Sequence, residues 1–219
     1  MSGLDTSHLL ALAAALGWAS GLRLYAVVFC TGAAGALGWV SLPAGLHVLQ
    51  NPLVLGAAGL MMLVEFFADK IPGVDSLWDV LHTLVRIPAG AALAAAVFGG
   101  DQAGWATAAG LLGGTLAATS HVAKATTRAA VNTSPEPFSN IALSLAGDAA
   151  VPTVLWLAWA HPLWAAVALA VAVVLMVVVT LLFWRFLNTL IQSLRRRLGG
   201  GGMNGKSGLQ TESQGTPHV

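Results

Sequence analysis

Four charged side chains lie inside segments that are otherwise apolar: Arg23, Glu65, Arg86 and Asp148. An α-helix rises about 1.5 Å per residue, so a position in a predicted span converts to a depth in a hydrocarbon layer about 30 Å thick. On this scale Glu65 lies about 10 Å inside the layer and the other three lie near its middle. A charge at that depth costs about 2.5 to 3.5 kcal/mol, so each should face the protein interior and have a partner. We expect Arg86 to pair with Asp148.

Charged and polar residues also follow helical spacing on two neighbouring segments. The first stripe has i, i+4, i+7, i+11 spacing and the second has i, i+3, i+7, i+11 spacing, so each occupies one helix face. The members are Asp75, Asp79, His82 and Arg86 in the first, and His121, Lys124, Arg128 and Asn132 in the second. A mostly acidic stripe can therefore oppose a mostly basic one. The pattern fits both an ion-pair network that locks helices together and a binding site.

The composition indicates a membrane protein. Of the 219 residues, 57% are hydrophobic and 9% are charged, and the mean hydropathy of +0.77 is too high for a soluble domain of this length. The net charge of +1 gives no reason to expect a nucleic-acid partner. The single cysteine, Cys30, excludes a disulfide framework.

Six segments are long and apolar enough to span a bilayer as helices. They are residues 8–36, 52–71, 76–98, 104–129, 137–158 and 163–187. With a cytoplasmic N-terminus, the three outer loops contain no Lys or Arg, and the inner segments contain nearly all of these residues. Following the positive-inside rule, we expect an all-α, multi-pass protein of the cell (inner) membrane with both termini cytoplasmic.

The chain is expected to consist of a transmembrane domain, 1–190, and a basic, then Gly-rich, disordered cytoplasmic tail, 191–219. ADKIPGVDSLWD at 68–79 has a weak echo in VNTSPEPFSNIA at 131–142. This suggests a parallel repeat of a helix pair, 52–98 and 104–158. Each pair ends in a helix that contains a proline, Pro88 or Pro152, which frees a carbonyl four residues earlier. Such carbonyls either form part of a solute site or accompany a packing kink.

Several strings resemble one known family. They are SGLRLY at 20–25, EFFADKIPGVDSLWDVLHTLVRIPAG at 65–90, SHVAKATTRAAVNTSPEPFSN at 120–140 and GD at 147–148. Together they resemble a family of small bacterial polytopic membrane proteins known only as a domain of unknown function. The resemblance spans about residues 10–185 and implies a polytopic membrane fold, with no established activity. Family members tend to have an acidic pair where this chain has Gly147 and Asp148, so a two-carboxylate role does not carry over to this position.

These features favour a transporter or channel for a small polar or ionic solute, with proton coupling as an option. The expected partners are the lipid bilayer and the solute, and no cofactor is expected. The site would open to the cytoplasm. Its candidate residues are Arg23, Glu65, Asp69, His82, Arg86, His121, Lys124, Arg128, Asn140 and Asp148.

Two alternatives stay open. The first is a membrane enzyme or translocator that handles a phosphorylated lipid head group at the cytoplasmic face. As an enzyme it would hold Mg²⁺ through Glu65, Asp69, Asp75 and Asp79, although their spacing matches no lipid phosphotransferase signature. The second is a structural or accessory membrane subunit. The sequence also leaves open a homo-oligomer.

Overall fold

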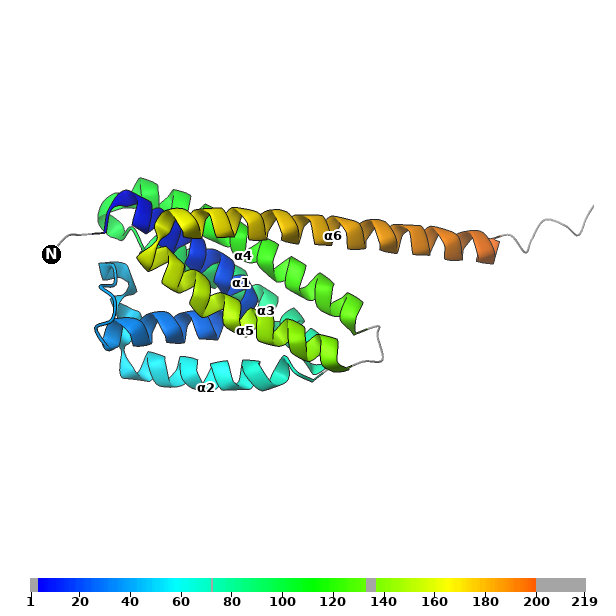
Figure 1. Ribbon diagram of the computed structural model, residues 1–219, viewed down its shortest axis with the longest axis horizontal. Helices are drawn as coiled ribbons and strands as arrows, with labels where there is room; N and C mark the ends of the chain where they lie inside the picture. Colours follow the sequence, from blue (N-terminus) through cyan, green and yellow to red (C-terminus); the bar gives the residue numbers. More distant parts are fainter. Residues whose placement is uncertain (1–3, 72, 133–136, 200–219) are drawn as a thin grey trace, which may run out of the picture. The chain divides into compact units, whose positions relative to one another are not determined.

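The computed structural model describes residues 4–71, 73–132 and 137–199, and in these residues all regular secondary structure is helical. The all-α fold class is therefore confirmed for the described part of the chain. The helices up to Thr180 form one compact unit, and the chain from Leu181 onward forms a second. The elements are α1 (Thr6–Ala36), the 3-10 helix η1 (Ala44–Gln50), α2 (Pro52–Ala68), α3 (Val74–Ala96), the 3-10 helix η2 (Gly100–Gln102), α4 (Ala103–Val131), α5 (Pro137–Ala160) and α6 (Pro162–Gly199) (Figure 1).

Helix α1 begins at a side-chain cap. The Asp5 carboxylate accepts hydrogen bonds from the Ser7 hydroxyl and from the backbone N–H of His8. These two hydrogen bonds favour the charged carboxylate and lower the pKa of Asp5. The Asp5 cap therefore fixes Thr6 as the first residue of α1.

The middle of α1 is interrupted at Arg23, whose φ of −150° and ψ of 86° are not helical. Before this residue α1 runs parallel to α4. Gly17 lies against Gly113, and Gly21, one turn later, lies against Ala117. Close approach of this kind needs small residues on both helices. The first half of α1 is thus fixed to α4.

After Arg23 the helix runs in the opposite direction along α2. Gly59 of α2 lies against the ring of Phe29, and Gly32 lies against Leu55. Later residues of α1 thus face earlier residues of α2, which means that the two helices are antiparallel. Figure 1 shows the dark blue first half and the lighter blue second half of α1 as two separate helical segments. Since α2 and α4 both run antiparallel to α3, the two halves of α1 form a helical hairpin with Arg23 at its tip. The predicted span 8–36 therefore corresponds to two shorter helices.

The hairpin gives the compact unit two different ends. One contains both ends of α1 together with η1 and η2, and we call it the short-helix end (Figure 1). At the other, α2 leads into α3 and α4 leads towards α5, and we call it the charged end. The tip of the hairpin points towards the charged end.

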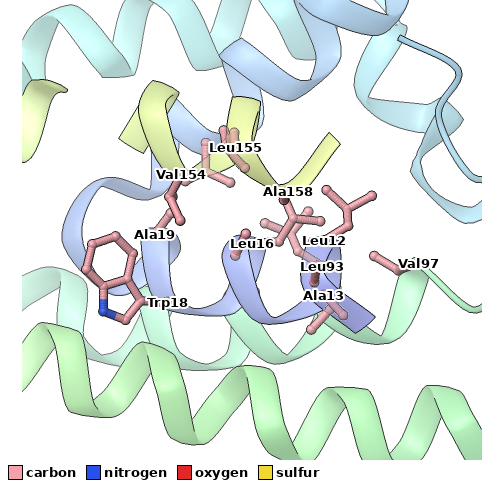
Figure 2. Close-up of a cluster of buried hydrophobic side chains, with 14 of the residues drawn as sticks. Leu12, Ala13, Leu16, Trp18, Ala19, Leu93, Val97, Val154, Leu155 and Ala158 are labelled. Atoms are coloured by element: carbon pink, nitrogen blue, oxygen red, sulfur yellow. The ribbon is translucent and has the colours of Figure 1, made fainter. Parts of the chain in front are cut away.

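An apolar core surrounds the first half of α1 (Figure 2). Figure 2 shows Leu12 and Leu16 of α1 among Leu93 of α3 and Val154 of α5, and all four are buried. The contact between Gly17 and Gly113 brings the α1 and α4 backbones together beside this core. Burial of these side chains stabilises the short-helix end without any charged group.

In length and composition, three described helices could cross a membrane: α1, α5 and α6. The pair η1 and α2, bent by 69° at their junction, would make a fourth. Six spans and the internal repeat are not confirmed and stay predictions. Helices α3 and α4 are less apolar because their polar stripes lower their mean hydropathy. The apolar helices are compatible with a membrane protein.

Helices α3 and α5 continue through Pro88 and Pro152, and both proline side chains are exposed. The backbone departs from helical geometry at Arg23 instead. Helix α6 continues to Gly199, so residues 191–199, the start of the predicted tail, are helical. Residues 200–219, the rest of that tail, lie outside the described residues.

Candidate functional site

Ten ionisable side chains from five helices and their ends form one connected network, which we call the charged core. The acids are Glu65, Asp69, Asp75, Asp79 and Asp148, and the bases are Arg23, Lys70, Arg86, Lys124 and Arg128. With every group ionised, the five negative and five positive charges cancel. The core therefore satisfies the requirement that buried charges be paired.

Asp69 is the centre of the charged core. It caps the C-terminus of α2, is completely buried, and lies between three cations. Its Oδ2 lies 3.0 Å from Nη1 of Arg23 and 3.1 Å from Nζ of Lys124, and its Oδ1 lies 2.9 Å from Nη1 of Arg128. One carboxylate thus holds the hairpin tip of α1 and two residues of α4 together.

A second chain of ion pairs links α2, α3 and α4. Arg86 donates to Glu65 Oε1 and to Asp79 Oδ1, the latter at 2.7 Å. Lys124 Nζ lies 3.1 Å from the same Asp79 oxygen and 3.1 Å from Asp69. The order Glu65, Arg86, Asp79, Lys124, Asp69 is therefore a continuous path of alternating charge.

Asp148 does not pair with Arg86, so this expected ion pair was wrong. Asp148 Oδ1 lies 2.8 Å from Nε of Arg23, and its Oδ2 lies 3.2 Å from Nζ of Lys70. The reason is that α5 packs against α1, whereas α3 packs mainly against α4 and α1. The hairpin tip of α1 thus supplies the partner of Asp148.

Near the interruption, side chains of α4 donate hydrogen bonds to backbone carbonyls of α1. The Leu22 carbonyl accepts a hydrogen bond from Lys124 Nζ at 2.9 Å, and the Trp18 carbonyl accepts one from the Ser120 hydroxyl at 2.7 Å. Arg23 Nη2 donates to both the carbonyl and the hydroxyl of Ser144. Broken helices in membranes need such partners, because lipid offers none.

The predicted opposition of the two stripes is confirmed by these contacts. Arg128 lies 3.6 Å from Asp75, and Asn132 donates to the same carboxylate. His121 lies 3.3 Å from Arg86 Nη1 and is within hydrogen-bond distance of Thr83.

Two predicted residues lie apart from these ion pairs. The His82 ring stacks on Trp78 and meets the edge of Tyr25. Asn140 of α5 is buried, and its amide has no hydrogen-bond partner among the described residues. Asn140, Ser144 and Asp148 share one face of α5 at i, i+4, i+8 spacing.

A cavity of about 260 Å³ opens beside the charged core between α1, α4, α5 and α6. One wall is charged and contains Arg23, Asp69, Lys124 and Arg128. The other walls are mostly apolar, with Trp18 and Leu22 of α1, Leu143, Ala146 and Ala150 of α5, and Leu175, Met176 and Val179 of α6. This wall contains three cations and one carboxylate, and each cation also pairs with a carboxylate of the charged core that does not line the cavity.

The acids do not gather as the Mg²⁺ alternative requires. Among the described residues, no three side chains of His, Cys, Asp or Glu lie together in a way that could hold a metal ion. Glu65, Asp69, Asp75 and Asp79 instead each face at least one cation of α1, α3 or α4.

Sequence reasoning missed two members of the site. Lys70 pairs with Asp148, and its Nζ lies 3.0 Å from the centre of the Phe66 ring. Ser144 lies one turn before Asp148 on the same helix face, which was a usable signal.

The fold and the site define an all-helical, membrane-compatible bundle with a charged core at the tip of a helical hairpin. The chain belongs to the family described as Domain of unknown function (DUF4126), whose sequence profile matches residues 10–181. The match includes every residue of the charged core, and the predicted membership of a family known as a domain of unknown function is confirmed. No curated protein and no solved structure matches the chain.

Proposed function

We propose that this protein is a membrane transporter that binds a small organic anion in the 260 Å³ cavity. One observation carries the proposal: the cavity lies where α1 is interrupted, and its charged wall has three cations to one carboxylate. Transporters commonly bind solutes at interrupted helices, where backbone groups and charged side chains face a cavity. Charged residues inside a membrane often mark such solute-binding sites.

The cavity also indicates the size and character of the anion. Pockets for drug-sized ligands typically have about 300–1,000 Å³, so this cavity suits something smaller. Its α5 and α6 walls are apolar, which favours an anion with an apolar body over a hydrophilic ion such as phosphate.

The hairpin supports a membrane orientation that differs from the one expected from sequence. The short-helix end contains no described Lys or Arg, whereas Lys70, Lys124 and Arg128 lie towards the charged end. Following the positive-inside rule, the charged end is cytoplasmic. Because both ends of α1 lie at the short-helix end, the N-terminus is then external. We replace the predicted cytoplasmic N-terminus with this proposal.

Labelling of a cysteine near the N-terminus tests this orientation. In a Cys30→Ala background, Ser7→Cys should react with a membrane-impermeant maleimide added to intact cells. Reaction only after the cells are permeabilised would restore the cytoplasmic N-terminus.

Binding and flux of benzenesulfonate test the transport proposal. This anion has an apolar ring and stays ionised, so it crosses a bilayer poorly by itself. Purified protein should bind it more tightly than methanesulfonate or inorganic phosphate, and proteoliposomes should take it up. An absence of both binding and uptake would overturn the proposal.

A matched pair of variants on α5 locates the binding site. Ala150 lines the cavity, whereas its neighbour Ala149 is exposed and does not line it. Ala150→Phe should fill the cavity and abolish benzenesulfonate binding without changing any charge. Ala149→Phe should bind as the wild type does. Equal binding by both variants would remove the cavity from the proposal.

An anionic lipid is a second candidate ligand, because its head group is negatively charged like the proposed soluble anion. The apolar wall formed by α6 also suits the apolar part of a lipid. Nanodiscs distinguish the two sources. Phosphatidylglycerol in the nanodisc should leave benzenesulfonate affinity nearly unchanged if the ligand is a soluble anion. Competitive loss of affinity, relative to nanodiscs of phosphatidylcholine alone, would instead indicate a lipid ligand.

A further inference from the structure

Glu65 and Asp79 each have one carboxylate oxygen without a hydrogen-bond partner among the described residues, but Asp79 faces three cations whereas Glu65 faces one. Glu65 lies on α2 and is completely buried. Oε1 accepts from Arg86, whereas Oε2 has no hydrogen-bond partner among the described residues. A buried polar atom without a partner costs free energy, so it needs an explanation. Asp75 also faces a single cation, Arg128, but both of its oxygens accept hydrogen bonds. Glu65 is therefore the carboxylate that a proton can neutralise with the least loss of pairing.

A cavity of about 450 Å³ lies between the second half of α1, α2 and α3, and its lining reaches to within one helical turn of Glu65 on α2. Ala58 and Met61 line it, and they precede Glu65 by seven and four residues on one face of α2. Tyr25 is the one polar side chain among the described residues that line it. In the part of the chain that the structure describes, this cavity and the 260 Å³ cavity share no lining residue.

The ion pairs connect Glu65 to the anion cavity. Arg86 is shared between Glu65 and Asp79, and Lys124 is shared between Asp79 and Asp69. Lys124 also lines the cavity. If Glu65 becomes neutral, Arg86 has Asp79 as its remaining carboxylate partner. Asp79 then holds Lys124 less strongly, which leaves Lys124 available for an anion.

The charge balance gives a reason for such coupling. The charged core has five acids and five bases, so an added anion would leave the buried cluster with one uncompensated negative charge. Uptake of one proton restores neutrality. Proton binding and anion binding then favour each other to the same extent, as linkage requires.

Resting on the proposed anion transport, we propose that Glu65 is the proton-binding group of this protein and that one proton enters with each anion. The proton from water adds to a carboxylate oxygen of Glu65, no other covalent bond changes, and the loaded charged core is neutral.

Other titratable groups surround Glu65, and an experiment has to separate them from it. Helix α1 contributes Arg23 and Tyr25, the end of α2 contributes Asp69, and α3 contributes Asp79, His82 and Arg86, while α4 contributes His121 and Lys124. Of these, His82 lies outside the charged core, stacked on Trp78, and provides a matched control.

Calorimetry of benzenesulfonate binding in buffers of different ionisation enthalpy counts the protons taken up. The ligand is a strong acid, so it contributes none. Wild type and His82→Gln should take up one proton per anion, with affinity rising by up to about tenfold for each unit that the pH falls. Glu65→Gln imitates the protonated form, so it should bind at least as well, take up no proton and show no pH dependence.

The result for the wild type alone decides whether a proton enters with the anion, even if Glu65→Gln fails to fold. Binding without proton uptake overturns the coupling, and unchanged uptake in Glu65→Gln overturns the assignment of the proton to Glu65. Both outcomes leave anion transport standing. If the wild type binds no benzenesulfonate, the proposed function fails. Infrared difference spectroscopy then still reports on Glu65, because its protonated carboxyl band should appear on acidification of the wild type and not of Glu65→Gln.

Discussion

The two ends of the compact unit contain the same helices but pack them in different ways. At the short-helix end, Gly17 meets Gly113 and apolar side chains fill the space around Leu12 and Leu16. At the charged end, ion pairs join the helices and a cavity lies beside them. Close-packed interiors resist rearrangement, whereas shared ion pairs can exchange partners. The short-helix end is therefore the rigid frame, and the charged end is where the structure can respond to a ligand.

The largest effect is expected at Asp69, because three cations depend on one carboxylate. Asp69→Asn leaves Arg23, Lys124 and Arg128 with one negative charge fewer. Breaking a buried pair on one side typically costs about 3–5 kcal/mol, and we expect a loss in that range in thermal unfolding of the purified protein.

Asp148→Asn is the matched comparison for Asp69→Asn. The Asp148 side chain is 23% exposed and faces two cations, so water compensates part of the loss. Its effect should be clearly smaller. A variant protein with Asp69→Asn that unfolds no earlier than one with Asp148→Asn would show that Asp69 does not organise the charged end.

A smaller loss is expected at the short-helix end from Gly17→Ala. A Cβ atom at Gly17 would lie 2.5 Å from the Gly113 Cα, so the two backbones must separate. Overpacking of this kind costs about 1–3 kcal/mol. Gly56→Ala, where a Cβ atom would meet nothing within 4 Å, should instead leave stability unchanged or raise it through helix propensity. Similar melting temperatures for the two variants would contradict the rigid-frame interpretation.

Much of the arrangement at the charged end could be predicted from the sequence, because helical spacing determines which side chains share a face. The stripes of α3 and α4 were correctly opposed, and the buried charges do have partners. The partner of Arg86 was not predictable, since ion pairing depends on which helices are neighbours. Four acids lie beside Arg86 and Arg23 in space: Glu65 and Asp79 beside the first arginine, and Asp69 and Asp148 beside the second. Nothing in the spacing of the acids along the sequence indicates which arginine each one pairs with.

The hairpin of α1 was missed for a related reason. No proline marks Arg23, and 31 apolar-rich residues fit a single span in length and composition. The turn is instead stabilised by contacts from other helices, such as the hydrogen bond from Lys124 to the Leu22 carbonyl. Tertiary contacts of this kind leave no local pattern in the sequence.

Double-mutant cycles sharpen the comparison within the charged end. Arg86→Met and Glu65→Leu should each destabilise, and the double variant should recover part of the loss, with a coupling of about 0.5–3 kcal/mol. Arg86 and Asp148 share no contact and are connected only through a chain of other ion pairs, so the coupling between Arg86→Met and Asp148→Asn should be smaller than in the first cycle. Strong coupling in the second cycle, measured by the same unfolding assay, would support the pairing expected from sequence and contradict the structure.

The smallest effects are expected at the two prolines. Pro88 and Pro152 are exposed, and α3 and α5 remain helical through them, so neither side chain lines the anion cavity. Pro88→Ala and Pro152→Ala should change benzenesulfonate affinity by no more than about 0.5 kcal/mol, the usual range for substitutions away from special features. Helix stability can only gain from the restored N–H groups. A large loss of binding in either variant would mean that a freed proline carbonyl belongs to the site, and that the cavity at Arg23 is only part of it.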